Sequence, residues 1–496
     1  MPISERRTAS SKEADPIAAA VAIMNQDPDR AVKIASEVLN DEPDNADALM
    51  VIGYLFQRAG RHGLSCAVLQ RAVQVAPQKG ELWAGIAVNH QRMGNEVRAR
   101  QMFQEAAKRG ENKYEHEIAT TYLEEGDFDR ALRYAERVLA REPQHMGARM
   151  TQGYACLALG DWERGWKGYA ATLASEWRKE IVVGDEVRWQ GEKGAHLFVY
   201  GEQGLGDEIV YASCIPDAAR DAASLVLECD PRLEGLFRRS FPGVHVYGTR
   251  LKQGVEWPND HEITHRVGIA GLPEFYRPSP ASCPGTPYLV ADPERRVQWR
   301  ALLDTLGPRP KIGLCWSGGK RWTKAAARAI GLEAFRPLIE GLDADFVSLQ
   351  YKDPTAEIAA TGLPVKHWKR AVESNDYDDT AALVAELDMV IGIHTTVHHV
   401  AGALGVPGVV LVPSRPSWNY ALPVYPWYRS ARVFRQRAGE TWVSTIRRLL
   451  SAPDYLSRLR PARGRGVACG DAEHHRNGEC AGGDQAADAR IAEVVS

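Results

Sequence analysis

AHLFVYGEQGLGDEIVY, residues 195–211, marks the point at which the chain changes from one architecture to another. Its first six residues are an apolar run that favours a buried strand, and a glycine-rich turn follows. Glycine lets the backbone turn tightly and approach a ligand closely. We expect a helix to begin there with Asp207 in its first turn, so that free N–H groups form an anion site beside a carboxylate able to act as a base. The pattern before this segment is a helical repeat, and the pattern after it alternates strands and helices.

The bulk composition predicts a globular protein of two or three domains, because 496 residues are too many for one ordinary core. A net charge of −3 gives no electrostatic reason to expect nucleic acid as the main partner. No apolar run approaches the roughly 18 residues of a membrane span, and the first residues lack the apolar core of a secretory signal. The eight cysteines stand singly, without a C-x-x-C pair, which predicts neither a zinc site nor a disulfide framework. A reducing cytoplasm is the expected location.

The first third of the chain repeats itself. Four glycines recur at spacings of 34, 32 and 34 residues, a small residue follows each by five positions, and prolines recur in step: Gly60, Gly94, Gly126 and Gly160; Ser65, Ala99, Ala131 and Gly165; Pro43, Pro77 and Pro143. We expect the glycine to end the first helix of each unit, the small residue to let two helices approach, and the proline to stop the second. Residue 111 is Glu where a proline is usual, so the third unit is irregular. This pattern resembles the tetratricopeptide repeat over about residues 14–175, with four good units and a degenerate first.

Stacked helix pairs of this kind form a superhelix whose concave face binds a peptide or a partner protein. The alternative is that the array serves only as a spacer or a dimerisation platform. Asn89 and Arg92 are candidates for the groove.

The rest of the chain, from about Arg188, alternates strands and helices. Short apolar strands separated by helices predict parallel sheets that are buried on both faces. A stretch from Leu272 to Pro287 that is rich in proline, serine and glycine reads as a connection between two such units, and a helix is expected over 293–306. Ligands of such sheets bind beyond the carboxyl ends of the strands, where the glycine turns fall. The further strands expected are 225–229, 244–247, 311–316, 345–350, 389–393 and 408–412.

A second segment with chemical potential runs from Leu387 to Gly408. Its strand ends at Ile393, Thr395 and Thr396 are able to cap the helix that follows, and small residues line that helix. The start of the helix is again an anion site, suited to a diphosphate. The hydroxyls and imidazoles there are candidates to bind sugar or phosphate.

Three segments carry a resemblance to bacterial proteins that join tetratricopeptide repeats to a GT-B glycosyltransferase domain of the heptosyltransferase branch. They are residues 201–207, 312–318 and 394–405, and the resemblance covers nearly the whole chain to about residue 450. It implies an α + α/β fold: an N-terminal helical solenoid followed by two Rossmann-like lobes of the GT-B type. It also implies a layout similar to that of protein O-glycosyltransferases such as flagellin glycosyltransferases.

The resemblance assigns roles to residues. It makes Asp207 the catalytic base and places a donor-phosphate contact at Arg328; the basic run around Lys320 and Lys324 suits an anionic diphosphate. The donor-binding set expected is Gly204, Gly206, Ser317, Lys320, Lys324, Arg328, His394, Thr395, Thr396 and His399. One departure concerns His394, because the family usually has aspartate there and an imidazole changes the charge near the donor. No D-x-D cluster stands in a suitable position, so transfer without a metal and without a cofactor is expected, with the nucleotide sugar as substrate.

Several of these residues have a plainer interpretation. Asp207 is also a suitable acid to complement a helix dipole, and Glu202 is either an alternative base or a hydrogen-bonding residue of the loop. His399 is either a donor ligand or a satisfied core histidine, and adjacent His398 and His399 do not share a helix face, which argues against a metal. Lys320, Lys324 and Arg328 are otherwise a solvated face. Outside these segments, His261 and His265 stay unassigned, and the tail with Cys469 and Cys480 has no spacing typical of a zinc finger.

The sequence thus predicts an enzyme that moves a sugar from a nucleotide sugar to a hydroxyl of a polypeptide recruited by the repeats, with flagellin or another surface protein as the acceptor implied by the resemblance. The alternatives are a non-catalytic scaffold whose glycosyltransferase-like lobes have lost turnover, which His394 favours, and an enzyme with a saccharide or lipid-linked acceptor. The domain division expected is a flexible start over 1–13, repeats over 14–178, a first lobe over 179–300, a second, donor-side lobe over 301–455 and a disordered tail over 456–496.

Overall fold

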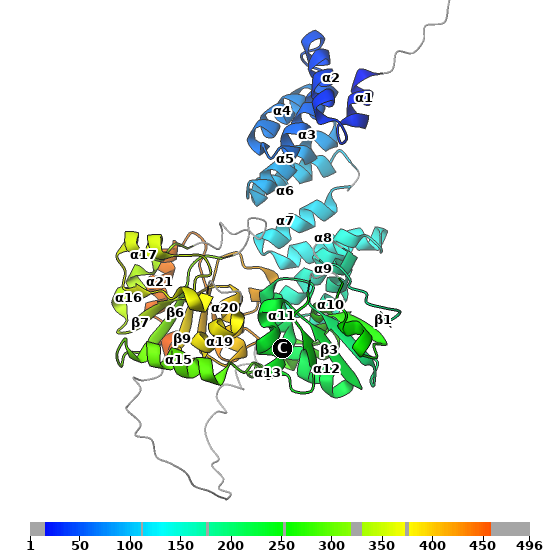
Figure 1. Ribbon diagram of the computed structural model, residues 1–496. Coiled ribbons are helices and arrows are strands. Elements are labelled where there is room, and N and C mark those ends of the chain that lie inside the picture. Colours follow the sequence, from blue (N-terminus) through cyan, green and yellow to red (C-terminus); the bar gives the residue numbers. More distant parts are fainter. Residues whose placement is uncertain are drawn as a thin grey trace, which may run out of the picture.

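The computed structural model describes residues 15–110, 113–174, 178–250, 254–318, 330–372 and 376–457. It consists of a helical solenoid followed by two parallel sheets with helices around them, as the sequence predicts (Figure 1). In Figure 1 the early helices extend away from the sheets, whereas α8, α9 and α10 lie beside the first sheet. Within the described residues, no helix has the length and apolar character needed to cross a bilayer.

In the described part of the chain, ten helices build the solenoid as five consecutive pairs. Each A helix is followed by a B helix, and the pairs are α1 (Pro16–Ile23) with α2 (Pro28–Asp41), α3 (Ala46–Arg58) with α4 (His62–Val75), α5 (Gly80–Arg92) with α6 (Glu96–Ala107), α7 (Glu115–Glu125) with α8 (Phe128–Arg141), and α9 (Met146–Leu159) with α10 (Trp162–Ala170). A short 3-10 helix, η1 (Ala171–Ala174), follows α10.

The repeat glycines act as the sequence predicts. Gly60, Gly94, Gly126 and Gly160 have φ between 72° and 89°, the left-handed region that favours glycine, at the turn between the two helices of a pair. The small residues five positions later are buried where the paired helices touch. A Cβ at Gly165 would lie 2.9 Å from the backbone nitrogen of Leu157, so only glycine fits there.

The first sheet has five parallel strands in the order β1-β5-β2-β3-β4. The strands are β1 (Val187–Arg188), β2 (His196–Tyr200), β3 (Ser224–Glu228), β4 (His245–Tyr247) and β5 (His265–Gly268). Around them lie α11 (Leu205–Tyr211), α12 (Ile215–Asp221), α13 (Glu234–Ser240) and α14 (Pro273–Tyr276). Strands β1 and β5, which the sequence did not predict, occupy one side of β2.

The second sheet has six parallel strands in the order β11-β10-β9-β6-β7-β8. The strands are β6 (Lys311–Cys315), β7 (Asp345–Ser348), β8 (Val365–Lys366), β9 (Met389–Ile393), β10 (Gly408–Val412) and β11 (Ala431–Arg435). The helices are α15 (Pro293–Asp304), α16 (Arg336–Gly341), α17 (Thr355–Thr361), α18 (Lys369–Val372), α19 (Tyr377–Ala385), α20 (Thr396–Ala403), α21 (Trp442–Leu450) and α22 (Pro453–Leu456).

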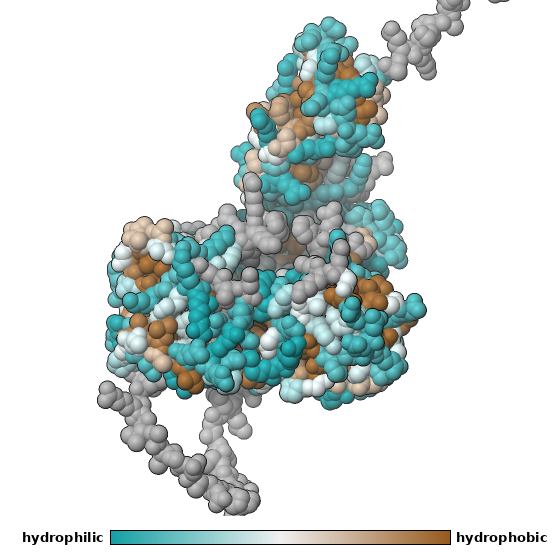
Figure 2. Space-filling view, viewed as in Figure 1, coloured by the Kyte–Doolittle hydropathy of each residue, from teal (hydrophilic) through white to brown (hydrophobic). Residues whose placement is uncertain are grey.

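Helix α15 belongs with the second sheet. Trp299 donates from Nε1 to Asp379 of α19 at 3.2 Å, and Arg296 and Arg300 both pair with buried Glu386. The domain boundary expected between residues 300 and 301 therefore falls inside α15. The sequence pattern does not reveal the contacts that join this helix to the second lobe. Figure 2 shows hydrophilic side chains gathered on this face where α15 and α19 lie.

The largest hydrophobic cluster is continuous from the last repeat through both lobes. It contains Trp166 of α10, Val199 of β2 and Val400 of α20. A second cluster covers the other face of the second sheet and includes Phe335 and Ile391. The last repeat and the two lobes therefore share one core, whereas the earlier repeats have separate clusters.

Candidate functional site

The glycine loop of the first lobe lies over a buried carboxyl group. Glu208 accepts a hydrogen bond from the backbone N–H of Asp230 at 2.8 Å and pairs with Arg250, which also donates to the carbonyl of Gln203. A Cβ at Gly201 would lie 2.6 Å from the Glu208 carboxyl carbon, so glycine is required for this approach. Burial raises the pKa of Glu208 to about 7, and the charge of Arg250 opposes that shift. The pair of Glu208 and Arg250 therefore holds the glycine loop in place through the bond to Gln203.

Glu202 serves the loop as a hydrogen-bonding residue. Its two carboxylate oxygens accept from Arg178 Nε at 2.6 Å and Nη2 at 2.9 Å, and Oε1 also accepts from the N–H of Ala270 at 3.2 Å. The pair is almost completely buried, with side chains 3% and 0% exposed. This arrangement corresponds to the plainer of the two interpretations of Glu202, because both oxygens are engaged in a planar, bidentate contact.

Asp207 is half-buried at the third position of α11. Its Oδ2 accepts from the N–H of Gly204 at 3.2 Å, so the carboxylate caps its own helix. Burial raises its pKa from 3.8 to about 6; the charge of Glu202 adds to the rise, and the Gly204 N–H, Arg178 and Arg250 oppose it. The charge of Asp207 also acts on the hydroxyls of Tyr154 and Tyr169, which belong to the last repeat. A carboxyl with such a pKa is ionised at neutral pH and more basic than an ordinary aspartate.

The second lobe places the start of α20 at the ends of β6 and β9. Thr395 occupies the N-cap position, but its hydroxyl lies 3.6 Å from Cys315 Sγ and makes no cap bond, which corrects the expectation that it caps the helix. Gly318 packs on Thr395, since a Cβ there would come within 2.7 Å of Thr395 Cγ2. Ser317 is held by Gln350, whose side chain donates to its hydroxyl and accepts its N–H at 3.3 Å. The sequence-predicted Ser317, Thr395 and Thr396 therefore lie together.

The three histidines of this segment have different surroundings. His398 donates from Nε2 to the carbonyl of Gly392 at 3.0 Å, and burial lowers its pKa to about 3. His399 is buried between the hydroxyls of Tyr428, 3.3 Å from Nδ1, and Tyr420, 3.4 Å from Nε2; burial lowers its pKa to about 4, so the ring is neutral. His394 is half-exposed, with its ring 4.9 Å from that of Tyr420. The surroundings of His399 are those of a satisfied core histidine, and its contact with a donor stays a prediction.

The two lobes meet through the helices that follow the glycine turns. Helix α11 packs on α20. A Cβ at Gly206 would lie 3.1 Å from His399 Cδ2 and 3.5 Å from the Thr396 hydroxyl, so the missing side chain lets the helices approach. Tyr288, in the connection between the lobes, donates to the carbonyl of Ile209 at 2.6 Å. The structure thus brings the predicted Gly206 of one lobe against the predicted Thr396 and His399 of the other.

An aromatic cluster joins the last repeat to both lobes. Trp162 stacks on Trp427 of the second lobe with ring centroids 5.4 Å apart, and Tyr154 stacks on Trp418 at 5.9 Å. Trp166 donates from Nε1 to the carbonyl of Arg277 in the first lobe at 2.7 Å. The sequence reasoning missed this junction. Its available signal was the density of aromatic residues in the last repeat and over 418–428, which repeat spacing alone does not interpret.

Hydrogen bonds tie the same repeat to the glycine loop. Tyr169 of α10 accepts at its hydroxyl from Gln203 Nε2 at 2.7 Å, and its carbonyl accepts from Arg178 at 3.1 Å. Asp207 therefore lies where the last repeat, the first lobe and the second lobe meet.

Two groups of predicted residues need separate mention. Lys320, Lys324 and Arg328 lie outside the described residues, as does Glu111. Asn89 is not a groove residue: it is fully buried and donates to the Ser65 hydroxyl at 2.7 Å, because a polar side chain at this helix-packing position is satisfied internally. Arg92 is exposed.

Comparison with known proteins finds a relative that matches most of the chain and solved structures that align with about a third of it. Protein FlbA of Caulobacter vibrioides is 28% identical over 452 residues, which cover 86% of this chain and 75% of FlbA. The solved structure of MamA aligns with 31% of this chain and 92% of its own, at 18% identity and a TM-score of 0.29. That of PilW, a type IV pilus biogenesis factor, aligns with 32% of this chain and 75% of its own, at 17% identity and a TM-score of 0.30.

A family model of the tetratricopeptide repeat matches residues 19–80 and 116–165. The first range runs from α1 to the first residue of α5 and the second from α7 to α10, where the glycine turns and small packing residues recur. The N-terminal helices of this chain are therefore tetratricopeptide repeats, a scaffold whose usual role is to bind proteins.

Proposed function

We propose that this chain is a glycosyltransferase that moves a sugar from a nucleotide-sugar donor to a hydroxyl of a polypeptide, which the repeats recruit. The observation that carries the proposal is the position of Asp207. A half-buried carboxyl group with a raised pKa lies where the last repeat, the first lobe and the start of α20 meet. A base at this position can contact both a polypeptide bound to the repeats and a donor bound to the second lobe.

The donor side of the proposal rests on the start of α20. Thr395 and Thr396 are half-exposed and stand at the carboxyl ends of parallel strands, where open α/β sheets bind their ligands. Backbone N–H groups at a helix start favour the negative charge of a phosphate. The basic residues Lys320, Lys324 and Arg328 follow Gly318 in the sequence, and Gly318 itself packs on Thr395. In the proposal, these cations and the helix dipole stabilise the nucleoside phosphate that leaves.

The acceptor side rests on Asp207 and the last repeat. The acceptor hydroxyl oxygen attacks the anomeric carbon of the donor sugar, the bond from that carbon to the phosphate oxygen breaks, and Asp207 takes the hydroxyl proton. The carboxylate must be ionised to act, so transfer should increase as the pH rises through about 6. An acceptor such as flagellin or another surface protein, modified in the cytoplasm before export, is the expectation that the family resemblance supplies.

The test combines a binding assay with a transfer assay. Purified full-length chain is heated with each of a panel of nucleotide sugars, and a donor at 100 times its dissociation constant should stabilise it by about 2.7 kcal/mol, seen as a melting temperature raised by several degrees. Transfer to candidate acceptor proteins is followed by intact mass. Asp207→Asn should keep the nucleotide shift and lose transfer. Asp127→Asn, which changes a helix-capping carboxylate of the repeats, is the matched control and should keep both.

The second candidate function is a non-catalytic repeat scaffold. It is favoured by His394 in place of aspartate and by the bond from Asp207 to its own helix N-terminus. No nucleotide shift with any member of the panel would support it and would reject sugar transfer. Transfer to a saccharide or lipid-linked acceptor, with no mass increase on proteins, would instead assign the repeats to partner recruitment.

A further inference from the structure

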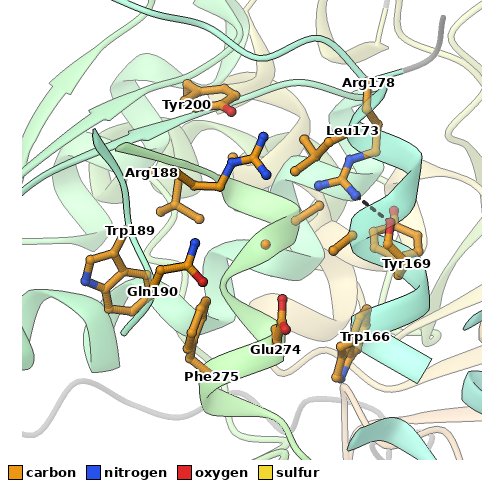
Figure 3. Close-up of a pocket in the computed structure, with 15 residues that line it drawn as sticks. Trp166, Tyr169, Leu173, Arg178, Arg188, Trp189, Gln190, Tyr200, Glu274 and Phe275 are labelled. Carbon is orange, nitrogen blue, oxygen red and sulfur yellow. Dashed lines mark hydrogen bonds between the residues drawn. The ribbon is translucent and has the colours of Figure 1, made fainter. Parts of the chain in front are cut away.

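A cavity separate from the start of α20 lies between the last repeat and the first lobe (Figure 3). It has a volume of about 170 Å³ and is lined by residues of α10, η1, β2, β5 and α14. Pockets that take drug-sized or nucleotide-sized ligands measure about 300–1,000 Å³, so this one suits a single side chain or a single small ring. Tyr169 and Arg178 line it and also hold the glycine loop that carries Asp207.

The walls of the cavity are partly apolar, and they carry one carboxylate that has no partner among the described residues. Trp166, Leu173 and Phe275 supply apolar surface, and in Figure 3 the carboxylate of Glu274 points into the space between them. Glu274 is half-buried, and among the described residues it forms no hydrogen bond or ion pair. Burial raises its pKa, and the charge of Lys167 opposes the shift. A bound cation would remove this electrostatic cost.

The positive charges around the cavity already have partners. Arg178 is paired with Glu202, and Arg188 with Glu180 at 3.1 Å. In Figure 3 the Arg188 guanidinium lies on the Tyr200 side of the cavity, away from Glu274. A second arginine, Arg266, shares Glu180 with Arg188, and among the described residues that line the cavity Glu274 is the charged side chain without a partner. Apolar surface beside one unpartnered carboxylate favours a ligand with an apolar stem and a cationic end.

We propose that this cavity binds one lysine-type side chain of the polypeptide that the repeats recruit. The ammonium group pairs with Glu274, the amide oxygen of Gln190 accepts a second hydrogen bond, and the methylene stem lies on Trp166 and Phe275. The identity of the carrier as an acceptor polypeptide rests on the proposed function, whereas the preference of the cavity for a cation does not. The pocket would fix the polypeptide beside the loop of Asp207.

The test measures binding to the full-length chain without any donor. Saturation-transfer NMR is recorded with Nα-acetyl-lysine methylamide, Nα-acetyl-norleucine methylamide and N-acetylglucosamine. The lysine probe should show transfer at its side-chain methylenes, and the norleucine probe, which lacks the ammonium group, should bind about tenfold more weakly or worse. Glu274→Gln should weaken lysine binding by a similar factor. Glu262→Gln, whose side chain is 70% exposed outside the cavity, is the matched control and should bind like the unaltered chain.

Equal binding of lysine and norleucine, or full lysine binding by Glu274→Gln, would overturn the proposal. Displacement of the lysine probe by N-acetylglucosamine at lower concentration would also overturn it, because the cavity would then be a carbohydrate site. A melting temperature for Glu274→Gln equal to or higher than that of the unaltered chain establishes that the variant is folded, because the substitution removes a partly buried negative charge. If the lysine probe binds but no nucleotide sugar raises the melting temperature, the cavity is a lysine site and the proposed sugar transfer is rejected. The two proposals can therefore fail separately.

Discussion

Replacement of Asp207 with asparagine is expected to stabilise the folded chain at pH 8 while it removes transfer. Burial raises the pKa of Asp207 from 3.8 to about 6, so the folded state holds this proton more tightly than the unfolded state does. The ionised carboxylate therefore lowers the free energy of unfolding; the loss begins as the pH rises above about 4 and is complete above about 6. The shift corresponds to at most about 3 kcal/mol. Because Asp207 is only half-buried and water screens part of its charge, we expect a gain of about 1–2 kcal/mol in the variant.

Urea denaturation at pH 8 and at pH 5 tests this reasoning, with the fluorescence of the tryptophans at the junction as the signal. Asparagine is able to accept the same Gly204 N–H, so the helix cap is retained and the charge alone is removed. The gain should be smaller at pH 5, where part of the wild-type carboxyl is protonated. Asp127→Asn should show no such gain. If Asp207→Asn is instead less stable than the unaltered chain by about 0.3–1 kcal/mol at pH 8, Asp207 only complements the helix dipole. The argument that its carboxylate is a base with a raised pKa then fails.

Three further substitutions probe the scaffold of the site by the same denaturation assay. Gly201→Ala should lower the free energy of unfolding by about 2 kcal/mol, because the new Cβ would lie 2.6 Å from the Glu208 carboxyl carbon and would displace that group. The control Gly63→Ala, whose Cβ would have nothing within 4 Å, should not destabilise the chain. Arg250→Met should lower the free energy of unfolding by about 3–5 kcal/mol at pH 8, because it leaves Glu208 buried and charged without a partner. The loss should be smaller at pH 6, where the Glu208 carboxyl group gains a proton. An equal loss at both pH values would contradict this reasoning. Trp166→Ala should cost about 3–5 kcal/mol and make the chain between repeats and lobes sensitive to limited proteolysis, and a resistant variant would argue against a shared core.

The shared core has a consequence for any partner on the repeats. The last repeat is held to the first lobe by Trp166 and to the second by Trp162, so its position relative to Asp207 is fixed by packing. The turn of the preceding repeat also approaches the second lobe, since a Cβ at Gly126 would lie 3.6 Å from Pro416 Cδ. The end of the solenoid nearest the lobes is thus rigidly oriented, and a polypeptide bound there is presented at a constant place.

Local patterns were sufficient for the secondary structure that surrounds the site. The glycine period predicted the helix turns because a left-handed residue is needed at each of them, and Gly60 and Gly160 adopt that conformation. The apolar runs before Gly201 and His394 predicted strands β2 and β9, since both are buried on both faces. Strand β5 escaped prediction because its run, His265–Gly268, is short and half polar at its start.

The assignment of Asn89 to the groove failed for a related reason. The exposure of Asn89 depends on which face of α5 packs against the neighbouring helices. Repeat spacing predicts where the turn after a helix falls, but it does not predict how the helix is rotated about its own axis. Likewise, Glu202 was ambiguous until its bidentate contact with Arg178, 24 residues away, was located. Long-range pairing of this kind leaves no signature in a single sequence.

The sequence alone determined that helical repeats come first and parallel strands with glycine turns follow, because helix and strand periods and turn residues are local properties. Only the tertiary structure decided that the last repeat enters the core of both lobes, that α11 and α20 touch through Gly206, and that Glu274 faces a partly apolar cavity without a partner among the described residues. Those features depend on contacts between residues up to hundreds of positions apart, and such contacts arise from the packing of whole elements rather than from the preference of any one segment.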